Sequence, residues 1–440
     1  MNEISRVLKR DKSYFEEYAI VDAMISLKHA TEMELVNLSV KQLGIPVTLA
    51  ALGRNFVFEE WRGNMNKHFP YQISGKCLMG NADEVKTPKG CLLAVMLGYT
   101  SVTTLEILRV GWMKVLCTGV RKKTYWYDYD LISAYTTGMK DLALPYYKSG
   151  HLITTENLKK WSTGDLLSGY LIINCRLKFP RDVKYPSIPC YVDESTTVYP
   201  LEGKGLLTGP EYILALSQGC KLDIKSVFYI PPTIEVKDLE MEKGSNEVDD
   251  SNDSNDSKKE FVLPFQNIIK ELQENRGKYP KGSFNNLFYK EIGNSIYGNV
   301  VRGLSNKKSF DTMTGEMFRI KGTELSNPIL ASWTTAFIRS VIGECLHNIS
   351  KLKGKVVSVT TDGFITNIAD LESKLLNLKE EEEIPLLTKY RSLRKDLGGC
   401  DALEVKKEGL GILSWTTRGQ LGIGSSIKAT TGFKVGDLEH

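Results

Sequence analysis

Three short stretches of the chain combine carboxylates, cationic groups and aromatic rings at spacings that could support chemistry. The first is YDYDLISAY, from Tyr127 to Tyr135. Its aromatic residues predict a strand, and because strand side chains alternate, Asp128 and Asp130 are expected to share one face. Asp130 would end the strand, where a carboxylate can bind a cation, with Ser133 and Tyr135 after a turn. Taken alone, a solvated acid at a strand end is the simpler interpretation.

The second stretch is KEIGNSIYG, which ends at Gly298 and lies within a helix predicted from Ser283 to Val300. Lys290, Asn294 and Tyr297 follow one another at i, i+4 and i+7, so they are expected on one face. That face would offer a cation for phosphate, an amide for hydrogen bonding and a ring for stacking, and Gly298 would leave room for a base. A surface helix with an incidental tyrosine is the alternative, but it does not explain a helical glycine that costs about 1 kcal/mol relative to alanine.

The third stretch is SVTTDGF, from Ser358 to Phe364. Apolar residues on both sides of Asp362-Gly363 predict a hairpin over Lys355 to Ile368, because Asp-Gly is a strong hairpin signal. We expect Asp362 at an exposed tip. On its own, an aspartate that merely suits the turn explains the pattern better.

The surrounding pattern predicts an α+β fold whose helices are inserted between strands that are distant in sequence. Apolar spacing predicts the helices, and β-branched and aromatic runs predict the strands. The further helices are expected over Glu16–Gln42, from Phe265 to Arg276 and over Ile329–Ile349, and the further strands over Tyr170–Leu177 and Ser226–Ile230.

Composition limits the class of protein. The 440 residues allow two to four domains, and 42% hydrophobic with 25% charged residues is typical of a globular protein. The eight cysteines form no CxxC pair, which argues against zinc and disulfide frameworks and favours a reducing compartment. The sequence shows no secretory signal and no run of about 18 uncharged apolar residues, so we expect no membrane association.

Charge is unevenly distributed. Residues 235–260 hold ten acids and four lysines, so the rest of the chain carries +10 against a total of +4. Residues 244–259 contain one apolar residue, Val248, which predicts a disordered acidic loop. A basic body is compatible with a nucleic-acid partner, although many basic proteins have none.

Together and in this order, the three stretches resemble motifs A, B and C of the family B DNA polymerases. Motif A, D-x-x-S-x-Y, is matched by Asp130, Ser133 and Tyr135. Motif B, K-x-x-x-N-S-x-Y-G, is matched completely by Lys290, Asn294, Ser295, Tyr297 and Gly298. The runs at 201–216 and 327–344 resemble palm segments of the organellar, viral and mobile-element branch, which includes protein-primed enzymes. The resemblance covers roughly residues 120 to 430.

Motif C departs from the family pattern D-T-D-S. Thr360 replaces the first acid and Gly363 replaces the serine, whereas Asp362 retains the second acid. The resemblance implies that Asp130 and Asp362 are the catalytic residues and the principal ligands of two Mg²⁺ ions, for which Mn²⁺ could substitute.

The resemblance also implies further binding residues. Lys290 would hold the triphosphate, with a second cation from Arg276, or from Lys278 or Lys281 nearby; we favour Arg276, because a guanidinium can engage phosphate bidentately. Tyr135 would reject a 2′-hydroxyl, and Ser133, Asn294, Tyr297 and Gly298 would complete the nucleotide site. Primer–template DNA would contact Lys406, Lys407 and Arg418, although solvated lysines explain the first two nearly as well.

A right-hand polymerase fold follows from the resemblance, with an antiparallel palm, helical-hairpin fingers and a partial thumb. Tyr18 and Asp22 resemble the Y-x-x-x-D exonuclease motif, but only 17 residues precede Tyr18, so we expect a remnant without proofreading. The expected parts are 1–110 (exonuclease remnant and linker), 111–260 (palm), 261–300 (fingers), 301–400 (palm) and 401–440 (start of the thumb).

The expected function is template-dependent DNA polymerisation from deoxynucleoside triphosphates. The alternatives are a catalytically inactive palm that binds DNA or a partner and, less well supported, a metal nuclease. Initiation on a terminal protein, without a primer or on an ordinary primer stays open. We expect an intracellular location, in the cytoplasm of a bacterium or virus-infected host or in a mitochondrion.

Overall fold

The computed structural model divides into two compact units, Met1–Lys67 and His68–His440. The first unit contains two helices, α2 (Lys12–Ser39) and α3 (Leu49–Asn64). The predicted acidic loop lies outside the described residues. The structure describes residues 12–39, 49–64, 124–191, 197–234, 261–304, 308–320, 322–323, 325–378, 384–416, 419–422 and 427–430.

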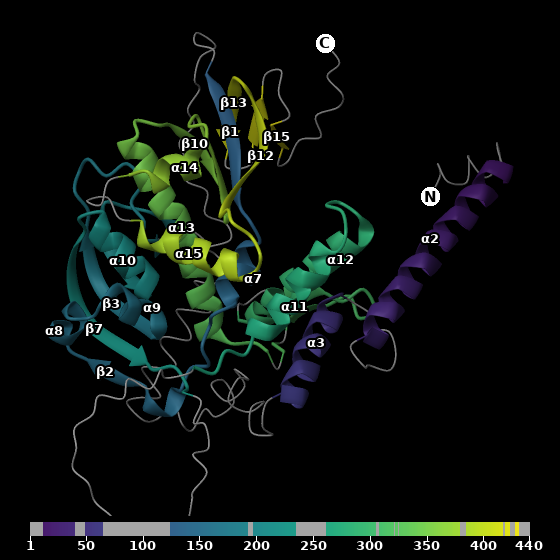
Figure 1. The fold of residues 1–440 in the computed structure, drawn as a ribbon, viewed down its shortest axis with the longest axis horizontal. Coiled ribbons are helices and arrows are strands. Elements are labelled where there is room, and N and C mark those ends of the chain that lie inside the picture. The colour runs from purple at the N-terminus through teal and green to yellow at the C-terminus, as the bar shows by residue number, and fades with distance from the viewer. Residues whose placement is uncertain are drawn as a thin grey trace, which may run out of the picture. The chain divides into compact units, whose positions relative to one another are not determined.

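A four-stranded antiparallel sheet organises the second unit, with the strand order β10-β11-β1-β12. Its strands are β1 (Tyr125–Leu131), β10 (Val356–Val359), β11 (Gly363–Thr366) and β12 (Leu403–Leu410). Every residue of β10 and β11 is buried, which is why these two strands read as apolar runs. Strand β1 pairs with β11 on one side and with β12 on the other, so the sheet brings together segments far apart in the chain; Figure 1 shows β1 beside β12.

A second antiparallel sheet has the order β2-β7-β3-β6. It consists of β2 (His151–Ile153), β3 (Tyr170–Lys178), β6 (Glu202–Leu207) and β7 (Lys221–Ile230). Buried and exposed residues alternate along the second half of β3, as expected for a sheet with one face in the core and one in solvent. This sheet lies apart from the β1 sheet in the second unit (Figure 1).

Helix α13 (Pro328–Lys351) forms the centre of the second unit. Asn327 caps it by accepting hydrogen bonds from the backbone N–H groups of Ile329 and Leu330, and α13 packs against α7, α10, α12 and α15. The helix is long and apolar enough to cross a membrane by length and composition, yet 89% of the relevant window is buried inside the protein. Its burial is that of a core helix.

Two helices precede α13 and pack against each other. These are α11 (Gln266–Gly277) and α12 (Phe284–Val301). Ser283 caps α12 by accepting a hydrogen bond from the N–H of Asn286. The other elements are α7 (Ala134–Met139), η3 (Tyr147–Ser149), α8 (Thr155–Lys159), α9 (Thr163–Ser168), β4 (Cys190–Tyr191), β5 (Thr197–Val198), α10 (Gly209–Ser217), β8 (Lys308–Phe310), β9 (Met317–Arg319), α14 (Leu371–Leu376), α15 (Pro385–Asp396), β13 (Ile412–Thr416), β14 (Gly419–Gly422) and β15 (Lys428–Thr430).

The predicted α+β class is confirmed, and the long helices agree with the apolar spacing. The hairpin over 355–368 is also present, but its predicted turn is wrong. Thr360, Thr361 and Asp362 make the connection, whereas Gly363 is the first residue of β11. Gly363 does not have the positive φ that an Asp-Gly hairpin turn requires.

Candidate active site

Asp130 and Asp362 meet at neighbouring strand ends. Asp130 lies near the end of β1, opposite Gly363 at the start of β11. The backbone N–H of Leu131 donates to the carbonyl of Asp362 at 2.7 Å, and the N–H of Thr360 donates to Gly363 at 2.7 Å across the turn. Two acids from distant segments are thereby fixed side by side. Asp362 is half-buried, so its expected exposure at the tip is wrong.

The backbone around Gly363 leaves no space for a side chain. A Cβ at this position would lie 2.6 Å from the carbonyl oxygen of Tyr129 and 2.8 Å from Oδ1 of Asp130. The first of these neighbours is backbone in the adjacent strand and cannot move away cheaply. The glycine in motif C therefore fits the close approach of β11 to the end of β1.

The two carboxylates influence each other electrostatically. Burial, followed by the nearby charge of Asp362, raises the pKa of Asp130 to about 7. Both effects penalise the ionised form. A cation placed between the carboxylates would relieve the repulsion.

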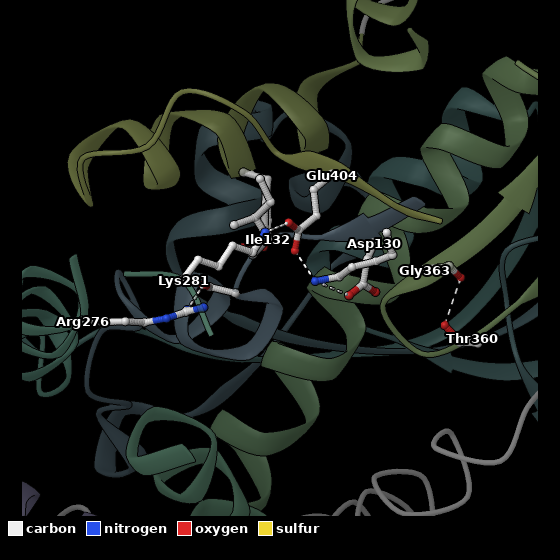
Figure 2. A network of polar contacts seen from close by, with 10 residues as sticks. Asp130, Ile132, Arg276, Lys281, Thr360, Gly363 and Glu404 are labelled. Atoms are coloured by element: carbon white, nitrogen blue, oxygen red, sulfur yellow. Dashed lines mark hydrogen bonds and ion pairs between the residues drawn. The ribbon is translucent and has the colours of Figure 1, made fainter. Parts of the chain in front are cut away.

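A third acid, Glu404, extends the site on the other side of β1. It lies opposite Asp130 in the register of β1 with β12. Lys406 forms an ion pair with Glu404, and its Nζ lies 3.7 Å from Oδ2 of Asp130. Lys281 donates to Glu404 at 2.9 Å, and Figure 2 shows this polar network around Asp130. Although burial opposes it, hydrogen bonding from Lys406 and Lys281 lowers the pKa of Glu404.

The structure places two of the predicted DNA contacts beside carboxylates. Lys406 is at Asp130 and Glu404, and Lys407 is opposite Asp128 in the strand register. Burial raises the pKa of Asp128, and the charges of Lys407 and Lys406 oppose this. Lys406 is exposed and Lys407 is half-buried, so the prediction that they contact DNA stays a prediction. Arg418 lies outside the described residues.

Ser133 turns the chain from β1 into α7. Its φ of 55° lies in the left-handed region that non-glycine residues rarely adopt. Nη1 of Arg276, in the last turn of α11, donates to Oγ of Ser133 at 3.2 Å. Figure 2 shows Arg276 reaching toward this connection. Arg276, which we favoured as the second cation for the triphosphate, thus contacts motif A directly. Lys278 instead donates to Asn275 within its own segment.

Tyr135 and Tyr297 join motifs A and B through their rings. The ring centroids are 4.1 Å apart, and the planes are inclined by 20°. Tyr297 shares a hydrogen bond of 2.5 Å with Oγ1 of Thr335 in α13, and Tyr135 is hydrogen-bonded to Thr361 in the motif C turn. Burial raises the pKa of both phenols, that of Tyr297 to about 12.

The motif B residues differ in their exposure along α12. Lys290, Asn294 and Gly298 are exposed along α12, whereas Tyr297 is 6% exposed and belongs to the core. A Cβ on Gly298 would meet no atom within 4 Å. The side of α12 that carries Lys290, Asn294 and Tyr297 therefore lies at the boundary between the exposed and buried parts of the helix, with the tyrosine on the buried edge.

Sequence reasoning missed Glu404 and the two threonines that hold the rings. Glu404 and Lys406 alternate along a strand, which indicates a common face, but nothing in the sequence shows which strand is its neighbour. Among the residues that the structure describes, no group of three or more His, Cys, Asp or Glu side chains could hold a metal ion.

Comparison with known proteins defines the relationship. No protein-family model matches the chain. It is 31% identical over 428 residues to the primer-independent DNA polymerase PolB of Escherichia coli, an alignment that covers 93% of this chain and 44% of PolB. With the three motifs, this similarity decides the family. The chain belongs to the family B DNA polymerases. It spans less than half of the length of this polymerase relative.

Solved family B polymerase structures align over most of the chain. The phi29 DNA polymerase complexed with primer–template DNA and incoming nucleotides aligns with a TM-score of 0.48 and 11% identity, covering 91% of this chain and 62% of that chain. An orthorhombic crystal form of the phi29 polymerase gives a TM-score of 0.49 and 10% identity, covering 91% and 61%.

Proposed function

We propose that the chain carries the nucleotidyl-transfer site of a template-dependent DNA polymerase. The observation that carries this proposal is the convergence of Asp130 and Asp362 at adjacent strand ends. Burial, followed by the charge of Asp362, raises the pKa of Asp130, and a bound cation would offset both effects. The relationship to PolB supports the same reaction.

The donor set suits Mg²⁺, with Mn²⁺ as a substitute. Mg²⁺ prefers oxygen ligands, keeps several waters, and is commonly held by one or two carboxylates together with substrate phosphates. Asp130 and Asp362 would hold two such ions. When bound, the ions stabilise the attacking 3′ oxygen and the leaving pyrophosphate of an in-line displacement.

Other residues would position the deoxynucleoside triphosphate. Arg276 and Lys290 supply cations for the triphosphate, and the guanidinium of Arg276 allows bidentate contact. Tyr135 would pack against the sugar and exclude a 2′-hydroxyl. Asn294 and Gly298, exposed on α12, would face the new base pair.

The elements fit the parts of a right-hand polymerase. We propose that the β10-β11-β1-β12 sheet is the palm, that α11 and α12 are the fingers, and that the segment after β12 begins the thumb. We also propose that this chain lacks proofreading, because Tyr18 and Asp22 resemble only one exonuclease motif. Since the relative is named primer-independent, synthesis on a template without a primer is a second property to test.

Primer extension with a labelled primer–template, Mg²⁺ and four deoxynucleotides tests the proposal. Asp130→Asn and Asp362→Asn should each lower the extension rate by about a thousandfold or more, since metal stabilisation of the transition state is worth several kcal/mol. Duplex binding in EDTA should remain. Wild-type-like extension by either variant would contradict the assignment, and a reaction without primer would show whether initiation is primer-independent.

The alternative is an inactive palm that binds DNA or a partner. The replacement of the first motif C acid by Thr360 favours it. Wild-type protein that binds primer–template but extends no primer with Mg²⁺ or Mn²⁺ would establish this alternative.

A further inference from the structure

Four basic residues form a continuous band on the second sheet. In the strand registers, Lys178 lies opposite Lys221 of β7, and Arg176 lies opposite Lys204 of β6. Arg176 and Lys178 are two residues apart in β3 and therefore point to the same face. All four residues are exposed. We call Arg176, Lys178, Lys204 and Lys221 the cationic band; it crosses three adjacent strands.

The band places like charges directly opposite each other at two positions. Such cross-strand pairs destabilise an antiparallel sheet, whereas opposite charges would stabilise it. Two acids interrupt the band: Glu202 lies opposite Lys178 and pairs with it at 3.0 Å, and Asp223 lies opposite Arg176 and pairs with Lys225 at 2.7 Å. These ion pairs are largely exposed and therefore weak. The four cations outnumber these two acids, so the face keeps an excess of positive charge.

The shape and composition of this face restrict its ligand. An open groove is lined by the four basic residues and their two acidic neighbours. The next positions along the face, Asn174 of β3 and Ser226 of β7, are polar. The described part of the band thus offers cations but no ring on which a base could stack. Proteins that hold single strands normally combine a basic groove with stacking aromatics, so a ligand recognised through its phosphates alone fits better.

We infer that the cationic band binds the phosphate backbone of duplex DNA without sequence preference. The band is in a different sheet from Asp130 and Asp362, so it is a second contact surface in addition to the active site. DNA as the polyanion rests on the proposed function. Neutralised phosphates release counterions, so each contact adds to the salt dependence of binding.

A charge-matched pair of variants tests this inference. The band variant combines Arg176→Gln, Lys178→Gln, Lys204→Gln and Lys221→Gln. The control variant removes the same charge from exposed lysines on other elements: Lys159→Gln, Lys355→Gln, Lys374→Gln and Lys395→Gln. Fluorescence anisotropy of a labelled blunt duplex and of a single strand of equal length is measured in EDTA over a series of KCl concentrations.

The band variant should bind the duplex at least about tenfold more weakly at low salt, and its slope of log K against log salt should become less negative by about 3 to 4. The control variant should change the slope by less than one. Melting of the band variant should occur close to that of wild type, because the removal of two like-charge pairs offsets the loss of the exposed Lys178–Glu202 ion pair. The inference would be wrong if the two variants had equal slopes of log K against log salt. It would also be wrong if the band variant lost affinity only for the single strand. An acidic protein would then be the better ligand class. If wild type extends no primer, the proposed function is wrong. The inference about the cationic band would still stand if the salt dependence of duplex binding changed in the band variant and not in the control.

Discussion

Tyr135 of motif A contacts one residue of motif B and one residue of the motif C turn. Its ring stacks on Tyr297, and its hydroxyl is hydrogen-bonded to Thr361 in the motif C turn. These contacts hold the ring on the motif A side of the proposed nucleotide site. A rigid ring can exclude a sugar hydroxyl only if it cannot swing away.

Removing this ring should relax the choice of sugar. We expect Tyr135→Ala to raise ribonucleotide incorporation relative to deoxynucleotide incorporation by about tenfold or more. Tyr135→Phe keeps the stack and loses only the hydroxyl, so it should discriminate nearly as wild type. Single-nucleotide incorporation with matched ribo- and deoxynucleotides measures the ratio. An unchanged ratio in Tyr135→Ala would remove the residue from this role.

Lys406 occupies space close to a proposed metal ligand. Its ammonium, paired with Glu404, lies 3.7 Å from Oδ2 of Asp130. A divalent cation bound to the same oxygen would compete with it. We therefore expect Lys406→Met to tighten Mn²⁺ binding severalfold, since a unit charge near 4 Å contributes a few kcal/mol at most in a half-exposed site.

Electron paramagnetic resonance of free Mn²⁺ measures this affinity without nucleotide or DNA. The neighbouring Lys407→Met is the control, because Lys407 lies opposite Asp128 instead. If Lys406→Met binds Mn²⁺ more weakly than wild type, Lys406 supports the site in another way.

The residue types of the site were predictable, but some of their neighbours were not. Asp130, Ser133, Tyr135 and Asp362 follow from motif spacing, and the structure brings them together. Glu404 joins them through a strand register that links β1 with a segment about 270 residues later. Local patterns contain no information about such a register.

Helix α12 contains two glycines with opposite surroundings. A Cβ on Gly293 would lie 2.9 Å from Cγ2 of buried Thr136 in α7, whereas a Cβ on Gly298 would meet nothing within 4 Å. Gly293 thus permits close packing of α12 on α7. Gly298 leaves the exposed face of motif B without a side chain at this position.

The two alanine variants should change stability in opposite directions. Gly293→Ala should destabilise the protein, because a Cβ 2.9 Å from Thr136 overpacks the interface, and overpacking of about 1–3 kcal/mol should exceed the helical gain of about 1 kcal/mol. Gly298→Ala should keep that gain and melt higher. If Gly298 faces the nascent base pair, the same variant should raise KM for nucleotide. Melting curves and steady-state extension check the pair, and a stabilised Gly293→Ala would contradict the packing argument.

At the scale of elements, long helices were the most predictable features. The predicted helix over Ile329–Ile349 agrees with α13 to within two residues at each end, because its apolar spacing and Asn327 cap are local signals. The motif C turn was not predictable, since Gly363 serves a close approach to Tyr129 and not a turn. Short strands such as β4 and β5 carry too few residues for a pattern.

Glu344 connects the central helix with α15 at the scale of the whole second unit. It is 2% exposed, and its carboxyl accepts hydrogen bonds from the backbone N–H groups of Leu386 and Leu387 at 3.2 and 2.7 Å. Tyr390 in the same helix α15 donates to the carbonyl of Ile132 at 2.8 Å. The support of motif A therefore reaches α13 through Glu344.

The titration of Glu344 should make stability depend on pH. Burial, opposed by the two N–H donors, raises its pKa to about 8 from the model-peptide value of 4.5. A raised carboxyl pKa favours folding at low pH, and this contribution is lost as pH rises from about 5 through 8, by about 1.4 kcal/mol for each unit of pKa difference.

Glu344→Gln should remove this dependence. Its denaturation midpoint should resemble that of wild type at about pH 4, where the carboxyl is protonated in both the folded and unfolded states, and exceed it at pH 9. Denaturant unfolding followed by tryptophan fluorescence at both values provides the measurement. Parallel pH profiles for the two proteins would show that Glu344 does not titrate in this range.

The convergence of residues 130, 276, 362 and 404 also bears on how the protein becomes competent after synthesis. Closing loops between such remote segments costs chain entropy that helices formed within one segment do not incur. During refolding, circular dichroism should therefore recover before any nucleotide is incorporated. Catalytic competence would mark the last stage of folding, so a half-assembled chain could not copy DNA with a half-built site.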